Sequence, residues 1–234
     1  MQKKGGVLLG AITVGKGTQA TLLEQRLQFF HLESTAVIRR WFAEHPNDPI
    51  TIEQKAKIKR GEIVDPPIIL RWMREAITTL VDQGKNIVLS GSPRSRFEAE
   101  GDEQSEGLYP LLSRLYGKEH VHTAHLFITE ERAVQRSKVR LVCVAHDHPV
   151  PDTPEYAEFR QKMICPWDGS PLQRRIDGLD DDEKIIRKRY REYMERLVPI
   201  REYLREQQYP VTEINGDDTV ENIFSEIVTT WDLK

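Results

Sequence analysis

The sequence has few cysteines, a small net charge and no long apolar run, and each absence excludes a class of protein. Two cysteines in 234 residues are too few for a disulfide-stabilised scaffold; they fit a reducing compartment, where metal binding is their commoner use. A net charge of −3 gives no bulk attraction to nucleic acid or to an anionic membrane. No stretch of about 20 apolar residues is available to span a bilayer. We therefore expect a cytoplasmic monomer that binds neither nucleic acid nor membrane.

The order of apolar segments predicts one α/β core with insertions. Strand-like runs at residues 29–32, 87–90, 121–128 and 211–214 alternate with helix-like stretches. This alternation favours a parallel sheet with helices on both faces. Residues 141–178, which contain five prolines and both cysteines, interrupt the pattern and are expected to be irregular.

Three details of the helices can be predicted from local signals. Ser34 or Thr35 can cap a helix that begins there, and Thr129 can cap a helix over residues 130–140. That helix would place Arg136 and Arg140, four residues apart, on one face. Further helices are expected over residues 105–117 and 181–207.

Residues 10–18 read Gly-Ala-Ile-Thr-Val-Gly-Lys-Gly-Thr and have the form of a phosphate-binding loop. They follow an apolar strand-like run and precede a helix-like stretch, as such a loop requires. Glycines let successive N–H groups point inward, and the helix N-terminus adds positive charge. The predicted ATP ligands in this loop are Thr13, Val14, Gly15, Lys16, Gly17 and Thr18. The alternative is an ordinary βα turn that matches by chance.

The loop places Gly17 after Lys16, where the common loop has Ser or Thr, and Gly-Lys-Gly-Thr-Gln-Ala resembles the adenylate kinase family of nucleoside monophosphate kinases. Two further segments resemble the acceptor-binding motifs of that family: residues 31–39, and the run Ser-Gly-Ser-Pro-Arg that starts at Ser90. The resemblance implies a monophosphate site formed by Ser34, Arg39, Glu62, Ile63, Val64, Gly91, Arg94 and Glu98. Taken singly, Arg39 could be a solvated surface residue and Arg94 part of a simple turn.

The same resemblance assigns the cations that would stabilise phosphoryl transfer. They are Lys16, Arg94, Arg136, Arg140, Arg175 and Arg189. Arg136 would also bind ATP, and Gly216 would lie in the loop around the ATP base. A single arginine on a charged helix is usually solvated, but a set placed around a phosphate loop favours catalysis. ATP with Mg²⁺ and a nucleoside monophosphate are the expected ligands.

The implied fold is a P-loop three-layer fold, a parallel β-sheet flanked by helices, with two insertions. Residues 1–32, 63–140 and 179–234 would form the core, residues 33–62 the monophosphate-binding insertion, and residues 141–178 a lid that excludes water. Two positions depart from the family. Ser90 replaces an aspartate that helps to hold Mg²⁺ through water, and Ile12-Thr13 replaces Pro-Gly. A catalytically weak nucleotide sensor, or a small-molecule kinase such as one acting on shikimate, is the rival interpretation.

Two pairs of possible metal ligands, each pair separated by two residues, predict a structural zinc ion in the lid. The expected ligands are Cys143, His146, Cys165 and Asp168. Family members resembling this chain carry a lid zinc in this arrangement. His148 could replace His146, and a metal-free lid held by hydrogen bonds is the alternative.

Glu98 bears on which base the acceptor nucleotide carries. Glu98 stands where the resembling family has a glutamine that reads adenine. A carboxylate can only accept hydrogen bonds, which suits the two donors of guanine better than adenine. Alternatively, Glu98 turns to Arg94 or Arg96 and reads no base. AMP remains the default acceptor, with measurable use of GMP expected.

Overall fold

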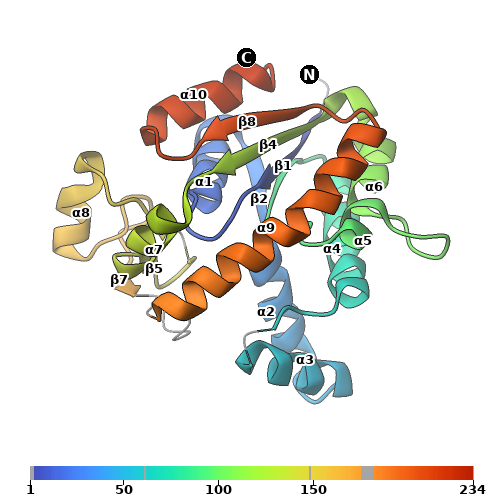
Figure 1. Ribbon diagram of the computed structural model, residues 1–234, viewed down its shortest axis with the longest axis horizontal. Coiled ribbons are helices and arrows are strands. Elements are labelled where there is room, and N and C mark those ends of the chain that lie inside the picture. The colour runs from blue at the N-terminus through green and yellow to red at the C-terminus, as the bar shows by residue number, and fades with distance from the viewer. Residues whose placement is uncertain (1–2, 61, 148, 175–181, 234) are drawn as a thin grey trace. The chain divides into compact units, whose positions relative to one another are not determined.

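The computed structural model describes residues 3–60, 62–147, 149–174 and 182–233 (Figure 1). Its strands are β1 Gly5–Leu9, β2 Phe29–Glu33, β3 Asn86–Ser90, β4 Val121–Phe127, β5 Leu141–Cys143, β6 Pro149–Val150, β7 Leu172–Arg174 and β8 Val211–Asn215. Its α-helices are α1 Lys16–Leu27, α2 Ser34–Glu44, α3 Pro49–Lys59, α4 Pro66–Asp82, α5 Arg96–Glu100, α6 Leu108–Tyr116, α7 Glu130–Lys138, α8 Ala157–Lys162, α9 Glu183–Glu206 and α10 Val220–Thr230. Two short 3₁₀ helices, η1 Lys118–His120 and η2 Pro154–Tyr156, complete the described elements.

A five-stranded sheet has the order β2-β3-β1-β4-β8. β3 pairs in parallel with β1 on one side and with β2 on the other. β1 is buried along its whole length and β3 from Ile87 onward, which explains why both sequences are nearly continuous apolar runs. The predicted α/β fold with a mostly parallel sheet flanked by helices is therefore confirmed.

Tertiary contacts divide the chain into two compact units, and the chain crosses between them after β1, after α1, and inside β4, α9 and β8. The phosphate loop falls in the second unit, and the predicted acceptor residues fall in the first. The first unit comprises Met1–Leu9, Gln28–Ala124 and Glu195–Thr212, and the second comprises Gly10–Leu27, His125–Met194 and Glu213–Lys234. The division into a core, a monophosphate-binding insertion and a lid remains a prediction.

Local sequence signals account for several helix starts. Pro66 and Pro67 occupy the first turn of α4, where their missing N–H groups cost nothing, and an apolar stripe buries the helix. The Thr129 side chain accepts from the backbone N–H of Arg132 and caps α7, as predicted. Among the described residues, no helix combines the length and apolar character that a membrane span requires.

The capping prediction at Ser34 or Thr35 is wrong. β2 runs directly into α2, so Glu33 occupies the N-cap position with extended backbone angles and no capping side-chain bond. Ser34 is therefore the first helical residue, and it is buried with 1% of its surface exposed. This places the Ser34 hydroxyl inside the first unit rather than at the backbone of its own helix.

The helix that was to carry both Arg136 and Arg140 is shorter than predicted. α7 ends at Lys138, and the chain enters β5 at Leu141, so Arg140 lies outside the helix. The helix predicted over residues 105–117 is also shorter, because α6 begins only at Leu108.

Residues 141–178 are more regular than predicted, as far as the structure describes them. β5 pairs in antiparallel fashion with β6 and with β7, and α8 follows η2. Figure 1 shows α8 next to these strands in the second unit. A small core holds this segment together and explains why its pattern was missed: the sequence supplies only a few apolar side chains, spaced far apart. They are Cys143, Val150, Cys165 and Leu172, with Leu141, Tyr156 and Trp167 packed against them.

Candidate active site

The phosphate loop lies between β1 and α1 and is tightly curled. Gly10 and Gly15 have φ angles of +151° and +109°. A Cβ atom on Gly10 would lie 2.6 Å from both the Leu126 carbonyl oxygen and Val14 Cγ1, so only glycine fits. Thr13 also has a positive φ of 58°, and its hydroxyl donates to the Ala133 carbonyl at 3.0 Å. The loop is thus anchored to α7 at a residue with a strained backbone.

Lys16 is the first residue of α1, and its side chain curls back over the loop. Its Nζ atom donates to the carbonyl oxygens of Gly10 at 2.7 Å and Ala11 at 2.8 Å. Tyr193 of α9 closes the arrangement, since its hydroxyl accepts from the Gly10 N–H at 2.5 Å. A cation at the start of a helix, with loop N–H groups beside it, is the arrangement that binds phosphate.

Arg136 and Gly216 lie against the same loop. Arg136 donates to the Val14 carbonyl at 3.4 Å and forms an ion pair with Asp217 at 3.2 Å. Burial lowers the pKa of the Arg136 guanidinium, and Asp217 partly offsets this shift. Gly216 donates to the Phe127 carbonyl at 2.8 Å, and a Cβ atom there would lie 2.8 Å from Val14 Cγ2. Two predicted ATP ligands distant in sequence therefore meet the loop.

Gly17 lies close to the lid segment. A Cβ atom on Gly17 would lie 2.9 Å from Cγ of Pro149, in β6. A serine or threonine here, as in the common loop, would force this contact apart. The remaining predicted ATP ligand, Thr18, is buried in α1.

The other predicted catalytic arginines lie in other segments of the chain. Arg189 lies on α9, and Arg140 lies between α7 and β5 with its N–H donating to the Ser137 carbonyl. Arg94 belongs to the first unit. Arg175 falls outside the described residues.

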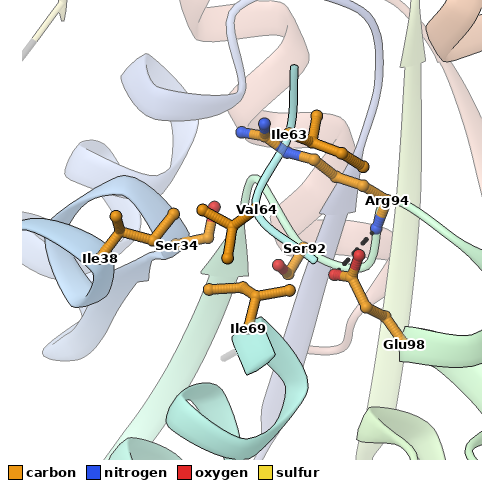
Figure 2. A pocket seen from close by; sticks show the side chains of 8 residues that line it. All are labelled: Ser34, Ile38, Ile63, Val64, Ile69, Ser92, Arg94 and Glu98. Carbon is orange, nitrogen blue, oxygen red and sulfur yellow. Dashed lines mark hydrogen bonds between the residues drawn. The ribbon is translucent and has the colours of Figure 1, made fainter. Parts of the chain in front are cut away.

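A pocket in the first unit brings together residues from four parts of the chain (Figure 2). Five of the predicted acceptor residues line it, together with Ile38, Ile69 and Ser92; the five are Ser34, Ile63, Val64, Arg94 and Glu98. Four of the eight lining residues are aliphatic and four are polar or charged, so the pocket offers both apolar walls and hydrogen-bonding groups to a ligand. Figure 2 shows the Arg94 guanidinium extending away from Glu98, so the two charged groups occupy different parts of the pocket.

Arg94 and Glu98 are held by local hydrogen bonds. Arg94 Nε donates to the Gly91 carbonyl at 2.6 Å. One Glu98 oxygen accepts from the Arg94 backbone N–H at 3.1 Å, and the other from the Ser95 hydroxyl at 3.4 Å. Burial raises the pKa of Glu98, although the Ser92 hydroxyl and the Arg94 charge favour its ionised form. Glu98 thus contacts the Arg94 backbone, not its guanidinium, and still faces the pocket.

Two buried hydroxyls in this pocket make no well-aligned hydrogen bond among the described residues, although that of Ser92 lies close to the Glu98 carboxylate. They belong to Ser34 and Ser92, and each residue is 1% exposed. An unpaired buried polar group costs on the order of 1–3 kcal/mol, so a ligand that supplied a partner to these hydroxyls would be stabilised by the contact.

The remaining predicted acceptor residues lie outside the pocket lining. Gly91 has a φ of +83°, and a Cβ atom there would lie 2.5 Å from Ser34 Oγ. Arg39 is exposed on α2. Glu62 is exposed and paired with Arg60 at 2.6 Å. Ser90, the residue in place of the aspartate, lies 2.7 Å from His31 Nε2 and offers a hydroxyl instead of a carboxylate.

Three of the four predicted metal ligands converge within the predicted lid segment, residues 141–178. Ligand atoms of Cys143, His146 and Asp168 all lie within 4.8 Å of one another. Asp168 accepts from His146 Nδ1 at 2.7 Å and from the Cys143 thiol at 3.2 Å. Cys165 is buried in the same small core, and its thiol interacts with both Cys143 and Asp168. His148 falls outside the described residues.

Burial and hydrogen bonds set the protonation of this cluster. Burial opposes ionisation of Asp168, but the Ser170 N–H, His146 and the two thiols hold its pKa well below the usual range. Burial raises the pKa of the Cys165 thiol to about 11. Cysteine, histidine and aspartate are the donor types that zinc prefers, so the residues present fit a structural zinc ion.

Sequence reasoning missed three residues at these sites. Ser92 lies inside the Ser-Gly-Ser-Pro-Arg run that starts at Ser90, but nothing in the sequence indicates that its side chain is buried. Tyr193 and Asp217 contact the phosphate loop and Arg136 respectively. Asp217 follows Gly216 directly, so its position next to the predicted base loop was the available signal.

Comparison with known proteins gives similarity over almost the whole chain. The adenylate kinase of Oceanobacillus iheyensis is 26% identical over 97% of this chain and 99% of its own length. The adenylate kinase of Gloeobacter violaceus is 28% identical over 94% of this chain and 95% of its own. That of Exiguobacterium sibiricum is 26% identical over 94% and 95%, respectively. No protein-family model matches the chain.

Proposed function

The chain belongs to the adenylate kinase family, and on that premise we propose that it is an ATP-dependent nucleoside monophosphate kinase with AMP as its default acceptor. The γ-phosphoryl group of ATP would pass reversibly to the phosphate of AMP, giving two molecules of ADP. The observation that carries the proposal is the curled loop at residues 10–16, with Lys16 at the start of α1 and Arg136 against Val14. The chain is a phosphotransferase; the choice of acceptor is the proposed part.

In this proposal the second unit binds the donor nucleotide. Loop N–H groups and Lys16 would hold the β- and γ-phosphates, after Lys16 exchanges its bonds to the Gly10 and Ala11 carbonyls for phosphate oxygens. Arg136 would neutralise charge that develops during transfer, and Gly216 would pass the ATP base. Arg140, Arg175 and Arg189 are proposed as further cations of the transfer step.

The first unit would bind the acceptor in its pocket. Arg94 supplies a planar fork suited to the monophosphate, and the aliphatic walls suit a flat base. No general base is required, because the attacking group is already a phosphate oxygen anion. The roles proposed for the acceptor residues are supported by their place in the pocket lining, by their charge, and by the resemblance of residues 31–39 and 90–94 to the acceptor-binding motifs of the family. Arg39 and Glu62 are proposed to act only once the acceptor is bound.

Two metal ions belong to the proposal. Mg²⁺ would arrive with ATP and neutralise phosphate charge. Thr18 offers a hydroxyl in the first turn of α1, while Ser90 cannot supply the carboxylate that the resembling family uses. A structural zinc ion would be held by Cys143, His146, Cys165 and Asp168. Four protein ligands leave no open position, so such an ion would stabilise the lid without taking part in chemistry.

Measuring diphosphate formation tests the proposal. The protein would be incubated with Mg²⁺-ATP and, separately, with AMP, GMP, CMP or UMP. We expect ADP formation with AMP, and slower formation of GDP with GMP because Glu98 offers two acceptors to guanine. ATP hydrolysis without diphosphate formation, or binding without turnover for all four acceptors, would contradict a kinase and favour the nucleotide sensor.

A further inference from the structure

Ser92, the residue before Pro93, carries a buried hydroxyl in the lining of the acceptor pocket. The residue is 1% exposed, and its hydroxyl faces Glu98 without making a well-aligned hydrogen bond to any described residue. A buried unpaired hydroxyl is destabilising unless a ligand completes it.

The Ser92 hydroxyl lies beside the Glu98 carboxylate, which has no hydrogen to donate to a ligand. Figure 2 shows Ser92 next to Glu98, and the hydroxyl is close enough to favour the ionised form of that carboxylate. The two Glu98 oxygens already accept from the Arg94 N–H and the Ser95 hydroxyl. Each oxygen keeps a second lone pair, so the Glu98 carboxylate can accept from a ligand but cannot donate to one.

Adenine presents one donor and one acceptor side by side. Its N6 amino group donates, and its N1 lone pair accepts. An amide side chain meets both, but an ionised carboxylate leaves N1 facing another lone pair. A second group must then supply the donor. Ser92 is the pocket residue with an unassigned hydroxyl next to Glu98.

We propose that Ser92 and Glu98 read the adenine edge together: Glu98 accepts from the N6 amino group, and the Ser92 hydroxyl donates to N1. This inference rests on the proposed kinase function and names a specificity residue for it. Together the two side chains would make the two hydrogen bonds to adenine that a single glutamine makes in the resembling family. A glutamate could therefore occupy this position in an enzyme that uses AMP. Guanine depends less on Ser92, because its N1–H and N2 amino groups both donate to the carboxylate.

A double-mutant cycle on purified full-length protein tests the pair. For Ser92→Ala we expect the AMP-to-GMP ratio of kcat/KM to fall by about 10-fold or more, mainly through KM for AMP. In the Ser92→Ala background, Glu98→Gln should restore the ratio, because the amide brings its own donor. Thermal stability of Ser92→Ala should stay close to that of the wild type, since the hydroxyl makes no well-aligned hydrogen bond within the protein.

Ser34→Ala is the matched control, because Ser34 carries the other buried hydroxyl of the pocket without a well-aligned hydrogen bond among the described residues and lies beside Gly91. It should lower AMP and GMP use alike. The inference is overturned if Ser92→Ala leaves the ratio unchanged, if Glu98→Gln gives no rescue, or if Ser34→Ala shifts the ratio equally. Failure of the kinase proposal would look different: wild-type protein would form no diphosphate with any acceptor.

Discussion

Thr13 gives the sharpest test of the phosphate loop, because a β-branched residue occupies a left-handed conformation there. Its φ is 58°, and its hydroxyl donates to the Ala133 carbonyl at 3.0 Å. Left-handed backbone costs a residue with a Cβ atom on the order of 1–2 kcal/mol, and a net hydrogen bond contributes about 0.5–1.5 kcal/mol. The two effects oppose each other, so the hydrogen bond offsets much of the strain.

Comparison of Thr13→Ala with Thr13→Gly separates the two effects. Both variants lose the hydrogen bond to Ala133, but only glycine also removes the strain. Glycine gains on the order of 1–2 kcal/mol from that relief and loses about 0.5–1 kcal/mol through the more flexible unfolded chain. Thr13→Gly should therefore be more stable than Thr13→Ala by up to about 1.5 kcal/mol, the reverse of the usual order. Thr13→Ser keeps the hydroxyl and should lie nearest the wild type.

Urea unfolding followed by far-UV circular dichroism measures this order. The midpoint of each variant would be compared at a common slope, so that differences report stability and not compactness. A Thr13→Ala variant more stable than Thr13→Gly would refute the left-handed conformation at Thr13, and with it the account of how the loop is curled.

Three further predictions follow from the same structure. Lys16→Met should keep the wild-type circular dichroism spectrum but lower diphosphate formation by about 10²-fold or more, since a charge next to the transferred group is lost; wild-type turnover in this variant would contradict the role given to Lys16. Protein purified without chelator should contain about one equivalent of zinc, and chelation should make the lid more sensitive to protease; well under one equivalent, with unchanged proteolysis, would count against the site. Hydrogen bonds from Lys57 and Gln54 hold the pKa of Asp65 below its usual value. Their contribution to stability is therefore full above the unfolded pKa of about 3.9 and is lost as the pH falls through the lower folded value. Asp65→Asn should reduce the loss of stability between pH 7 and pH 3, and an equal loss in both proteins would contradict this ion pair.

The sequence by itself determined the features that depend on neighbouring residues. The strand, glycine loop and helix around Lys16 are local, since φ requirements and helix-start signals act over a few positions. The cap at Thr129 is local for the same reason, and it forms on α7 as the sequence predicts. The alternation of apolar strands with amphipathic helices was sufficient to predict the α/β fold.

Tertiary structure decided the features in which distant segments compete or converge. α7 stops before Arg140 because residues 141–143 pair with β6 and β7, and a strand pairing outweighs one more helical turn. Ser34 enters the pocket because β2 leaves no room for a capping residue before α2. The burial of Ser92 depends on α2, α4 and α5 closing around it, and no spacing in the sequence encodes that enclosure. Hydrogen-bond partners and burial depend on the folded chain, so the chemistry of the acceptor pocket could be read only there.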